Sequence, residues 1–310
     1  MADTCGSDTI FSRIAIDGTT PTNVIGDFTA ADPAFQLDGD SDLSFHEEQI
    51  NPETLNGRIV ADSELSVPGN VNWDGGFGVL LSPDVIFHFM PYILGGAWTS
   101  LTSSPTDAAP PDINLLLHKD AYLYPYSLGK IDEAVISGEQ GKPVRLRLKF
   151  LGKTRLTLTA GSTWPASLDV NVSAPYMFEN FVVTVGGTVV KCRKWQITRK
   201  NNLGYRYWGS TSPDCIKRDA RTQTTITLTM PHSTAIVPLF VNHTASTNRN
   251  VVLTGTHPVG AQSCVINLPY TQFPKMDPPV SGSEILVETT GTARGLAGAR
   301  EITVVNDNTP

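Results

Sequence analysis

Alternation of apolar and polar residues is the dominant pattern along this chain. Val144–Phe150 reads Val-Arg-Leu-Arg-Leu-Lys-Phe, which places four apolar side chains on one face of a strand and three basic ones on the other. Thr154–Thr159 repeats the pattern after Leu151-Gly152-Lys153, a segment predicted to be a turn. Further strands rich in Val, Ile and Thr are predicted at Phe181–Val185, Val189–Thr198, Thr224–Met230, Ile236–Val241, Val251–Thr254, Cys264–Leu268, Ile285–Thr290 and Glu301–Val305. The pattern predicts a mainly β protein.

One segment has helical periodicity instead. Ser82 can cap a helix, Pro83 suits the first helical position, and Asp84 complements the positive end of the helix dipole. Apolar residues then recur at helical spacing, and Gly95-Gly96 ends the pattern; they are Val85, Ile86, Phe89, Met90 and Ile93. Pro91 is expected to kink or shorten the last turn. We expect this helix to pack against a sheet.

Composition divides the chain into an arm and two similar halves. Residues 1–40 are polar with scattered Gly and Pro, and we expect them to form an N-terminal arm. Residues 41–160 and 161–310 are predicted to be two related β units in tandem. An internal echo favours duplication, because Lys130–Ser137 aligns with Lys191–Thr198 at an offset of 61 residues.

The chain is mildly acidic. Its 310 residues carry a net charge of −7, and the pI is near 5.3. This balance argues against a protein that coats nucleic acid over its whole surface, because such binding requires Lys and Arg to neutralise phosphates. No apolar stretch reaches the roughly 18 residues of a membrane-spanning helix, and the acidic N-terminus differs from a secretory signal. We expect a soluble protein that is made in the cytosol, with no membrane insertion.

Signatures of catalysis and of cofactor binding are absent from the sequence. It contains no phosphate-binding Gly-x-x-x-x-Gly-Lys-Ser/Thr loop, no dinucleotide fingerprint and no Gly-x-Ser-x-Gly elbow. His46-Glu47-Glu48 begins like a zinc-binding His-Glu-x-x-His motif, but Ile50 stands where the second histidine is required. Four cysteines are too few and too scattered for a disulfide framework. We therefore predict no enzyme activity, no metal and no cofactor.

An acidic segment near the N-terminus has two interpretations. Asp38, Asp40 and Asp42 occupy alternate positions, as the oxygen ligands of a calcium loop do. However, Leu43 stands where such a loop needs Gly, and Gln49 replaces the final Glu. The more favoured interpretation is a solvated acidic loop, which continues into Glu47 and Glu48.

A basic segment between Lys191 and Trp208 is interleaved with aromatic residues. It contains Arg193, Lys194, Arg199, Lys200 and Arg206 together with Trp195, Tyr205 and Tyr207. Such a mixture can bind single-stranded nucleic acid, form the charged face of a strand pair, or form an assembly surface rich in Arg, Tyr and Trp. Because the whole chain is acidic, an assembly surface is ranked first and nucleic-acid binding last.

Several segments follow one another in a characteristic order. They are Phe45–Asn51, Leu55–Arg58, Val67–Asn72, the helix that ends at Gly96, Leu128–Glu139, Val144–Phe150, Pro175–Val189, Lys191–Thr198 and Ser212–Ile216. In order and spacing the chain resembles the major tail tube protein family of long-tailed bacteriophages, over about residues 43–305.

This resemblance implies β-sandwich or barrel-like units with one flanking helix, which assemble into stacked rings around a hollow tube. The rings of such proteins are hexameric, or trimeric and pseudo-hexameric where one chain holds two units. The expected partners are further copies of the chain, the tail terminator, tail tip and tape measure proteins, and viral DNA, which passes through an acidic lumen without specific binding. The expected location is the virion tail.

The charged segments are the expected contacts within or between rings. They comprise Asp38, Asp40, Asp42, Glu47, Glu48, Arg193, Lys194, Arg199 and Lys200. Three other classes stay open. They are a capsid-decorating or tail-tip β module that binds a partner without polymerising, a β-sandwich hydrolase, and an exported calcium-binding adhesin.

Overall fold

The computed structural model describes most of the chain. The described residues are 13–17, 28, 32–39, 41–50, 67–106, 109–119, 122–155, 159–160, 164–165, 168, 170–171, 173–233, 248–259, 262–274, 286–295 and 300–307. The architecture is mainly β, with a single α-helix among these residues. The mainly β prediction with one flanking helix is confirmed.

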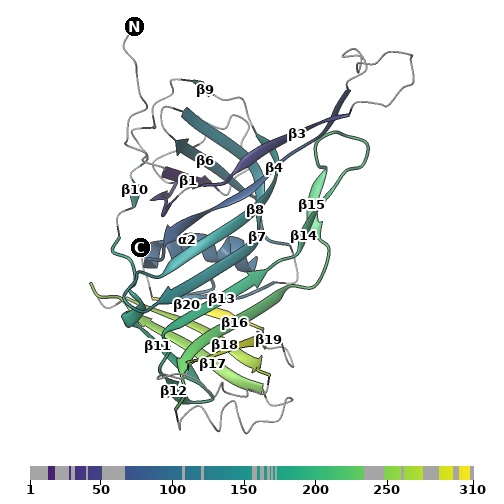
Figure 1. Cartoon of the computed structure of the whole chain (residues 1–310). Coiled ribbons are helices and arrows are strands. Elements are labelled where there is room, and N and C mark those ends of the chain that lie inside the picture. Colours follow the sequence, from purple (N-terminus) through teal and green to yellow (C-terminus); the bar gives the residue numbers. More distant parts are fainter. Residues whose placement is uncertain are drawn as a thin grey trace.

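Seven antiparallel strands form one continuous layer, here called the front sheet (Figure 1). In spatial order they are β3 (Ser44–Ile50), β4 (Val67–Leu80), β8 (Arg145–Arg155), β7 (Tyr122–Glu139), β13 (Lys194–Lys200), β16 (Gln223–Pro231) and β19 (Leu286–Ala293). β7 is long enough to serve two layers: its first half also pairs with β6 (Ile113–Lys119), and its second half pairs with β13.

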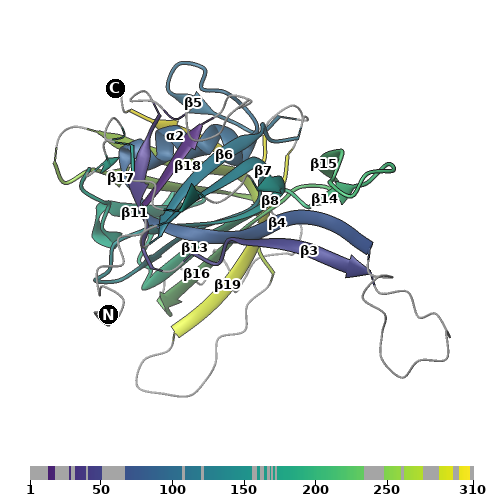
Figure 2. The same cartoon turned by 90° about the horizontal axis from the view of Figure 1, so that it is seen from above.

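The remaining strands complete the fold. They are β1 (Arg13–Asp17), β2 (Ala34–Gln36), β5 (Thr102–Ser103), β9 (Thr159–Ala160), β10 (Val170–Asn171), β11 (Phe181–Val185), β12 (Thr188–Val190), β17 (Asn248–Thr256), β18 (Ser263–Gln272) and β20 (Thr303–Asn306). Figure 2 shows helix α2 (Pro83–Leu94), β5, β11, β17 and β18 behind the front sheet when it is seen from above. A short 3-10 helix spans Phe178–Asn180. A separate two-stranded ribbon, β14 (Leu203–Arg206) with β15 (Cys215–Arg218), leaves the sheet between β13 and β16.

Helix α2 (Pro83–Leu94) forms where the sequence predicts it. The side chain of Ser82 accepts a hydrogen bond from the backbone N–H of Val85, and Gly95 ends the helix in the left-handed conformation with φ of 80°. The helix continues past Pro91 to Leu94 rather than ending early. The apolar side chains that the sequence places at helical spacing are buried in the main core; they are Val85, Ile86, Phe89, Met90 and Ile93. The expected packing of this helix against the sheet is confirmed.

Side-chain alternation determines the two faces of the front sheet. On β8, Leu146, Leu148 and Phe150 have no exposed surface, while Arg145 and Arg147 point to solvent. Full burial of a side chain of this size contributes roughly 1.5–3 kcal/mol, so the alternation fixes which face packs on the back layer.

The turn predicted at Leu151-Gly152-Lys153 is wrong, because β8 runs straight through it to Arg155. Trp73 on the neighbouring strand β4 is directly opposite Gly152. A Cβ atom on Gly152 would overlap the indole ring of Trp73. Gly152 therefore marks a site of close packing rather than a turn. The strand predicted at Val189–Thr198 is also interrupted, since β12 ends at Val190 and β13 begins at Lys194. The strand predicted at Ile236–Val241 lies outside the described residues.

Part of the expected N-terminal arm is built into the β-structure. β1 pairs with both β2 and β6, and Ile14, Ala15 and Ile16 are almost fully buried. The two segments of the internal echo lie side by side in the front sheet, where Ile136 of β7 is directly opposite Ile197 of β13.

The two halves of the chain repeat the same antiparallel pairings in the same chain order. The first half contains the pairs β1–β2, β1–β6, β6–β7, β7–β8, β4–β8 and β3–β4. The second half contains β11–β12, β11–β17, β17–β18, β18–β19, β16–β19 and β13–β16. The pair β7–β13 joins the halves, so that the last front-sheet strand of one meets the first of the other.

Candidate assembly interface

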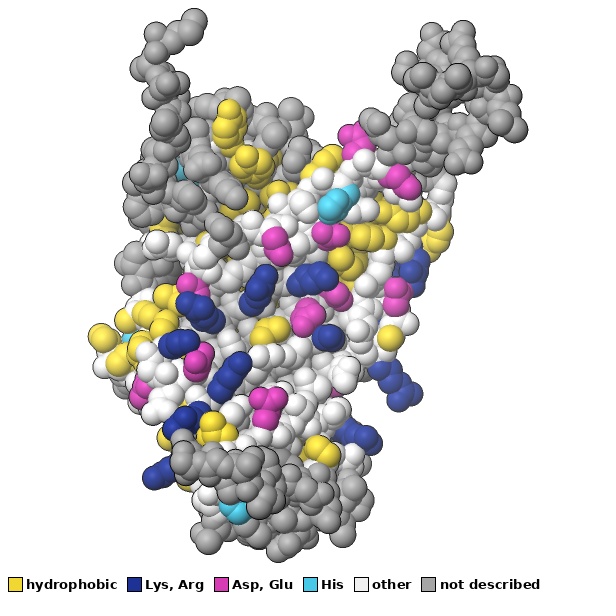
Figure 3. All heavy atoms as spheres, in the orientation of Figure 1, with side chains coloured by type: hydrophobic (Ala, Val, Ile, Leu, Met, Phe, Trp, Pro, Cys, Tyr) yellow, Lys and Arg dark blue, Asp and Glu magenta, His cyan; other side chains and the backbone are white. Residues whose placement is uncertain are grey.

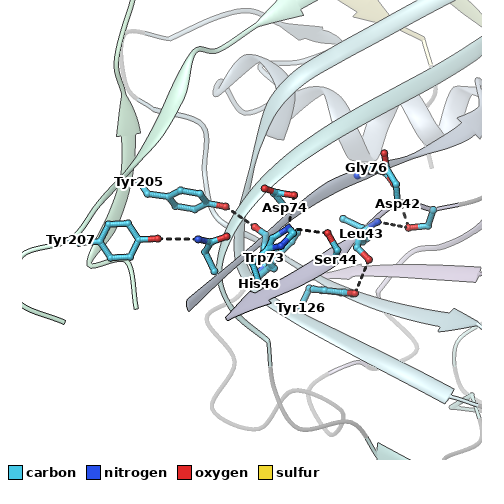
Figure 4. Close-up of polar contacts among 12 residues, drawn as sticks. Asp42, Leu43, Ser44, His46, Trp73, Asp74, Gly76, Tyr126, Tyr205 and Tyr207 are labelled. Carbon is cyan, nitrogen blue, oxygen red and sulfur yellow. Dashed lines mark hydrogen bonds and ion pairs between the residues drawn. The ribbon is translucent and has the colours of Figure 1, made fainter. Parts of the chain in front are cut away.

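The β3–β4 hairpin extends from the body of the molecule at one end of the front sheet (Figure 2). Its base is held by hydrogen bonds between side chains and the backbone, which Figure 4 draws. The backbone N–H of Gly76 donates to Asp42 Oδ1 at 2.5 Å, and the Tyr126 hydroxyl donates to the carbonyl of Leu43 at 3.2 Å. A Cβ atom on Gly75, whose φ is 116°, would collide with the Asp42 backbone. These contacts therefore fix the point at which the hairpin projects beyond the other strands of the front sheet.

The β14–β15 ribbon supports the hairpin from the side. The Tyr205 hydroxyl donates to the carbonyl of Trp73 at 2.7 Å, and the Asn72 amide donates to the Tyr207 hydroxyl at 3.1 Å (Figure 4). Burial raises the pKa of Tyr205, so its hydroxyl stays a donor at any physiological pH. These two hydrogen bonds, here called the hairpin–ribbon clamp, were not predicted from the sequence. The only sequence signal of the clamp was the Tyr205–Trp208 aromatic cluster.

A Ser, a His and an Asp meet on the outer face of the hairpin. His46 Nε2 lies 3.0 Å from Ser44 Oγ and 3.1 Å from Asp74 Oδ1. In a nucleophilic triad the base contacts its nucleophile with one ring nitrogen and its carboxylate with the other. Here one nitrogen makes both contacts, so the group does not have the geometry of such a triad.

The acidic residues predicted as contacts lie along the hairpin side of the front sheet. Asp38 pairs with Arg145 at 2.7 Å, and Asp42 lies 3.7 Å from Arg147. Glu47 is exposed, and Glu48 accepts a hydrogen bond from the backbone N–H of Asn70. Asp40 lies outside the described residues. Within the described part of the chain, no group of three or more His, Cys, Asp or Glu side chains could hold a metal ion.

The basic residues of β13 divide between the two faces of the sheet. Lys194 and Lys200 point outward, opposite Glu139 and Glu133 of β7, and Lys200 Nζ lies 3.9 Å from Glu133 Oε2. Arg193, just before the strand, is exposed.

Arg199 corrects the expectation of a surface contact, since it is only 2 % exposed and pairs with Glu301 behind the sheet. It shares the inward side with Ile197 and Trp195, two and four residues earlier on the strand. Trp195 is fully buried over Gly138, so it cannot stack on a nucleic-acid base.

The outward face of the front sheet is polar and of mixed charge. Figure 3 shows Lys and Arg interspersed with Asp and Glu over this face. Arg145, Arg147 and Lys149 follow β8, and they are flanked by carboxylates on β4, β7 and the segments beside β3. β16 carries a neutral row, namely Gln223, Thr225, Thr227 and Thr229. Because most of the basic groups face a carboxylate, the described residues of this face leave no large basic stripe for DNA phosphates.

Both lateral edges of the front sheet are open in the described part of the chain. β3 pairs with β4 alone, and β19 pairs with β18 only through Thr292 and Ala293. An open edge presents unpaired N–H and C=O groups to any neighbouring strand. Within the described residues, both edges therefore carry backbone groups with which a further strand can pair.

Comparison with known protein families gives a match over most of the chain. The profile of a family described as "Phage tail tube protein" matches residues 12–293, which spans both halves of the repeated pairing. No curated protein matches the chain. Among the described residues, no helix has the length and hydrophobicity that crossing a membrane requires. Because the family profile covers nearly the whole sequence, the chain belongs to the phage tail tube protein family and is a structural protein of the phage tail.

Proposed function

We propose that this protein is the major subunit of the tail tube and that its copies join edge to edge into rings. The observation that carries the proposal is the repeated set of pairings, because it makes the β7–β13 contact a template for the contact between copies. Within one chain, β13 is the first front-sheet strand of the second half, and it pairs with β7, the last front-sheet strand of the first half in spatial order. β3 is its counterpart in pairing order, and its outer edge is open.

The same argument favours two tube units per chain. Each unit contributes its own part of the front sheet, so three chains supply six units around the axis. The ring is then a trimer with pseudo-sixfold symmetry. Contacts of this head-to-tail kind close into a ring when the rotation per unit is right.

In this arrangement the polar outward face of the front sheet lines the channel. Several of its lysines and arginines are paired with carboxylates, as Arg145 is with Asp38 and Lys200 with Glu133. DNA passing along such a wall meets little uncompensated positive charge, and it releases few counterions on contact. The duplex therefore slides through during genome ejection rather than sticking.

Stacking of the rings gives the tube its length. The β3–β4 hairpin reaches beyond one end of the sheet, where it can contact the next ring (Figure 2). The tail terminator, tail tip and tape measure proteins are the expected partners at the ends and in the channel.

Electron microscopy of the purified, concentrated protein tests this proposal. We expect hollow tubes or stacked rings over a range of salt concentrations. Discrete monomers in every condition, and also in the presence of preformed tail tips, would contradict it and favour a module that binds a partner without polymerising.

A further inference from the structure

An arginine-rich hollow lies at the end of the front sheet from which the β14–β15 ribbon leaves. A shallow depression of about 610 Å³ and a smaller one of about 180 Å³ adjoin there and share Arg218, Thr222 and Glu301 in their walls. Arg221 lines the first depression and Arg300 the second. In a chain with an excess of acidic residues, this concentration of arginines is unusual.

The hollow contains more positive than negative charge. Three arginines line it, Arg218, Arg221 and Arg300, against two carboxylates, and both carboxylates pair with other arginines: Asp219 with Arg206, and Glu301 with Arg199. Glu301 also accepts a hydrogen bond from the Thr222 hydroxyl at 3.0 Å. Arg221 has no ion-pair partner among the described residues.

The buried floor of the hollow increases this imbalance. Arg199 donates to the Thr224 hydroxyl at 2.9 Å, but its Nε and Nη2 atoms are buried without a hydrogen-bond partner. Burial and the neighbouring Arg218 lower the pKa of Arg199 to about 10. A second carboxylate near the mouth of the hollow would offset this cost, because the attraction between charges is strong where water is excluded.

The opposite end of the sheet offers such a carboxylate. β13 runs from Lys194, opposite Glu139, to Lys200, opposite Glu133, and Arg199 is at the Lys200 end. Glu179 is exposed beside the turn after Glu139, and its Oε1 accepts only the backbone N–H of Gly141, at 2.7 Å. Unlike Glu139, which pairs with Lys142, Glu179 makes no ion pair with the described residues.

We infer that the arginine hollow of one copy receives an acidic side chain from the opposite end of a copy in the next ring, with Glu179 as the donor. The inference rests on the proposed tube function, and it assigns the chemistry of ring stacking. The partner is a second copy of this chain, since only that copy brings the far end of the same sheet to the hollow.

Charge reversal tests the inference. Arg221→Glu with Arg300→Glu should leave rings intact but abolish stacking, or raise the protein concentration needed for stacking by about tenfold or more. Adding Glu179→Arg to the same chain should restore stacking, because every interface then carries the swapped pair. Lys217→Glu, on the ribbon but outside the hollow, is the matched control. Thermal unfolding checks that each variant is folded. If a charge-reversed chain does not fold, the neutral variant Arg221→Gln with Glu179→Gln replaces it in the test.

The outcomes separate this inference from the proposed function. Rings without stacks, rescued by the swapped chain, would support both. Stacks of wild-type length and salt dependence in the reversed variant would overturn the role of the hollow and leave the tube function standing. Failure of the wild-type chain to form rings or stacks would remove the tube function and this inference with it.

Discussion

Whether a side chain of this protein is buried or exposed depends chiefly on the face of the strand that it occupies. The sequence alternation was sufficient to predict the buried Leu and Phe residues of β8, and it also contained the information that Arg199 points inward with Trp195 and Ile197. The charge of Arg199 led to a surface assignment instead. Its partner Glu301 is 102 residues away in sequence, so the pairing that makes burial possible could not be predicted locally.

Gly152 should tolerate no larger side chain. In Gly152→Val the added atoms would overlap Trp73 and displace its indole N–H from the Ser127 carbonyl, a 3.0 Å hydrogen bond. We expect a loss of about 2–4 kcal/mol in the free energy of unfolding. Urea denaturation measures it, with Lys149→Ala on the same strand as an exposed control that should change stability by less than about 0.5 kcal/mol. Equal effects from the two changes would contradict the packing role of Gly152.

Two thiols, the half-buried Cys192 and the buried Cys264, should make stability depend on pH at the alkaline end. Burial raises the pKa of Cys192 and Cys264 to about 12 from an ordinary value of 9.0. The folded protein then keeps these protons while the unfolded chain loses them, so stability is full below about pH 9 and falls as the pH rises above it. Urea midpoints across this range measure the slope. Cys192→Ala with Cys264→Ala should reduce it, and an unchanged slope would contradict this account.

At the scale of elements, the strand and helix positions could be predicted but their long-range partners could not. Capping residues and apolar spacing gave α2 correctly, because these signals are local. Gly152 misled the strand prediction because glycine serves equally in turns and in close packing. The hairpin–ribbon clamp joins residues more than 130 positions apart, so no local sequence pattern predicts it.

The clamp should hold the β3–β4 hairpin in place. Tyr205→Phe combined with Tyr207→Phe removes both hydroxyl contacts, and each net hydrogen bond contributes about 1 kcal/mol. We expect faster amide hydrogen exchange in β3 and in the first part of β4. Tyr122→Phe, at an exposed tyrosine, is the control. Unchanged exchange rates in the hairpin would show that the ribbon does not support it.

The outward basic residues at the start of β13 should take part in assembly. Arg193→Glu with Lys194→Glu reverses two exposed charges opposite Glu139, and we expect weaker ring or tube formation. The effect should be larger at low salt, because salt screens exposed charges. Light scattering against ionic strength measures it. Equal assembly of wild type and variant at every ionic strength would exclude this segment from the interface.

At the scale of the whole molecule, the central claim is that one chain holds two tube units. The sequence hinted at this through a short echo, but the supporting observation is the repeated order of strand pairings, which is a property of the fold. The claim explains why the front sheet is continuous across both halves, and why its open edges belong to different units. It also predicts how many copies close a ring.

Native mass spectrometry of assembled rings tests that claim most directly. Three copies of the 33.5 kDa chain should give a ring of about 100 kDa, with pseudo-sixfold symmetry in electron microscopy class averages. A ring of six copies, near twice that mass, would contradict two tube units per chain.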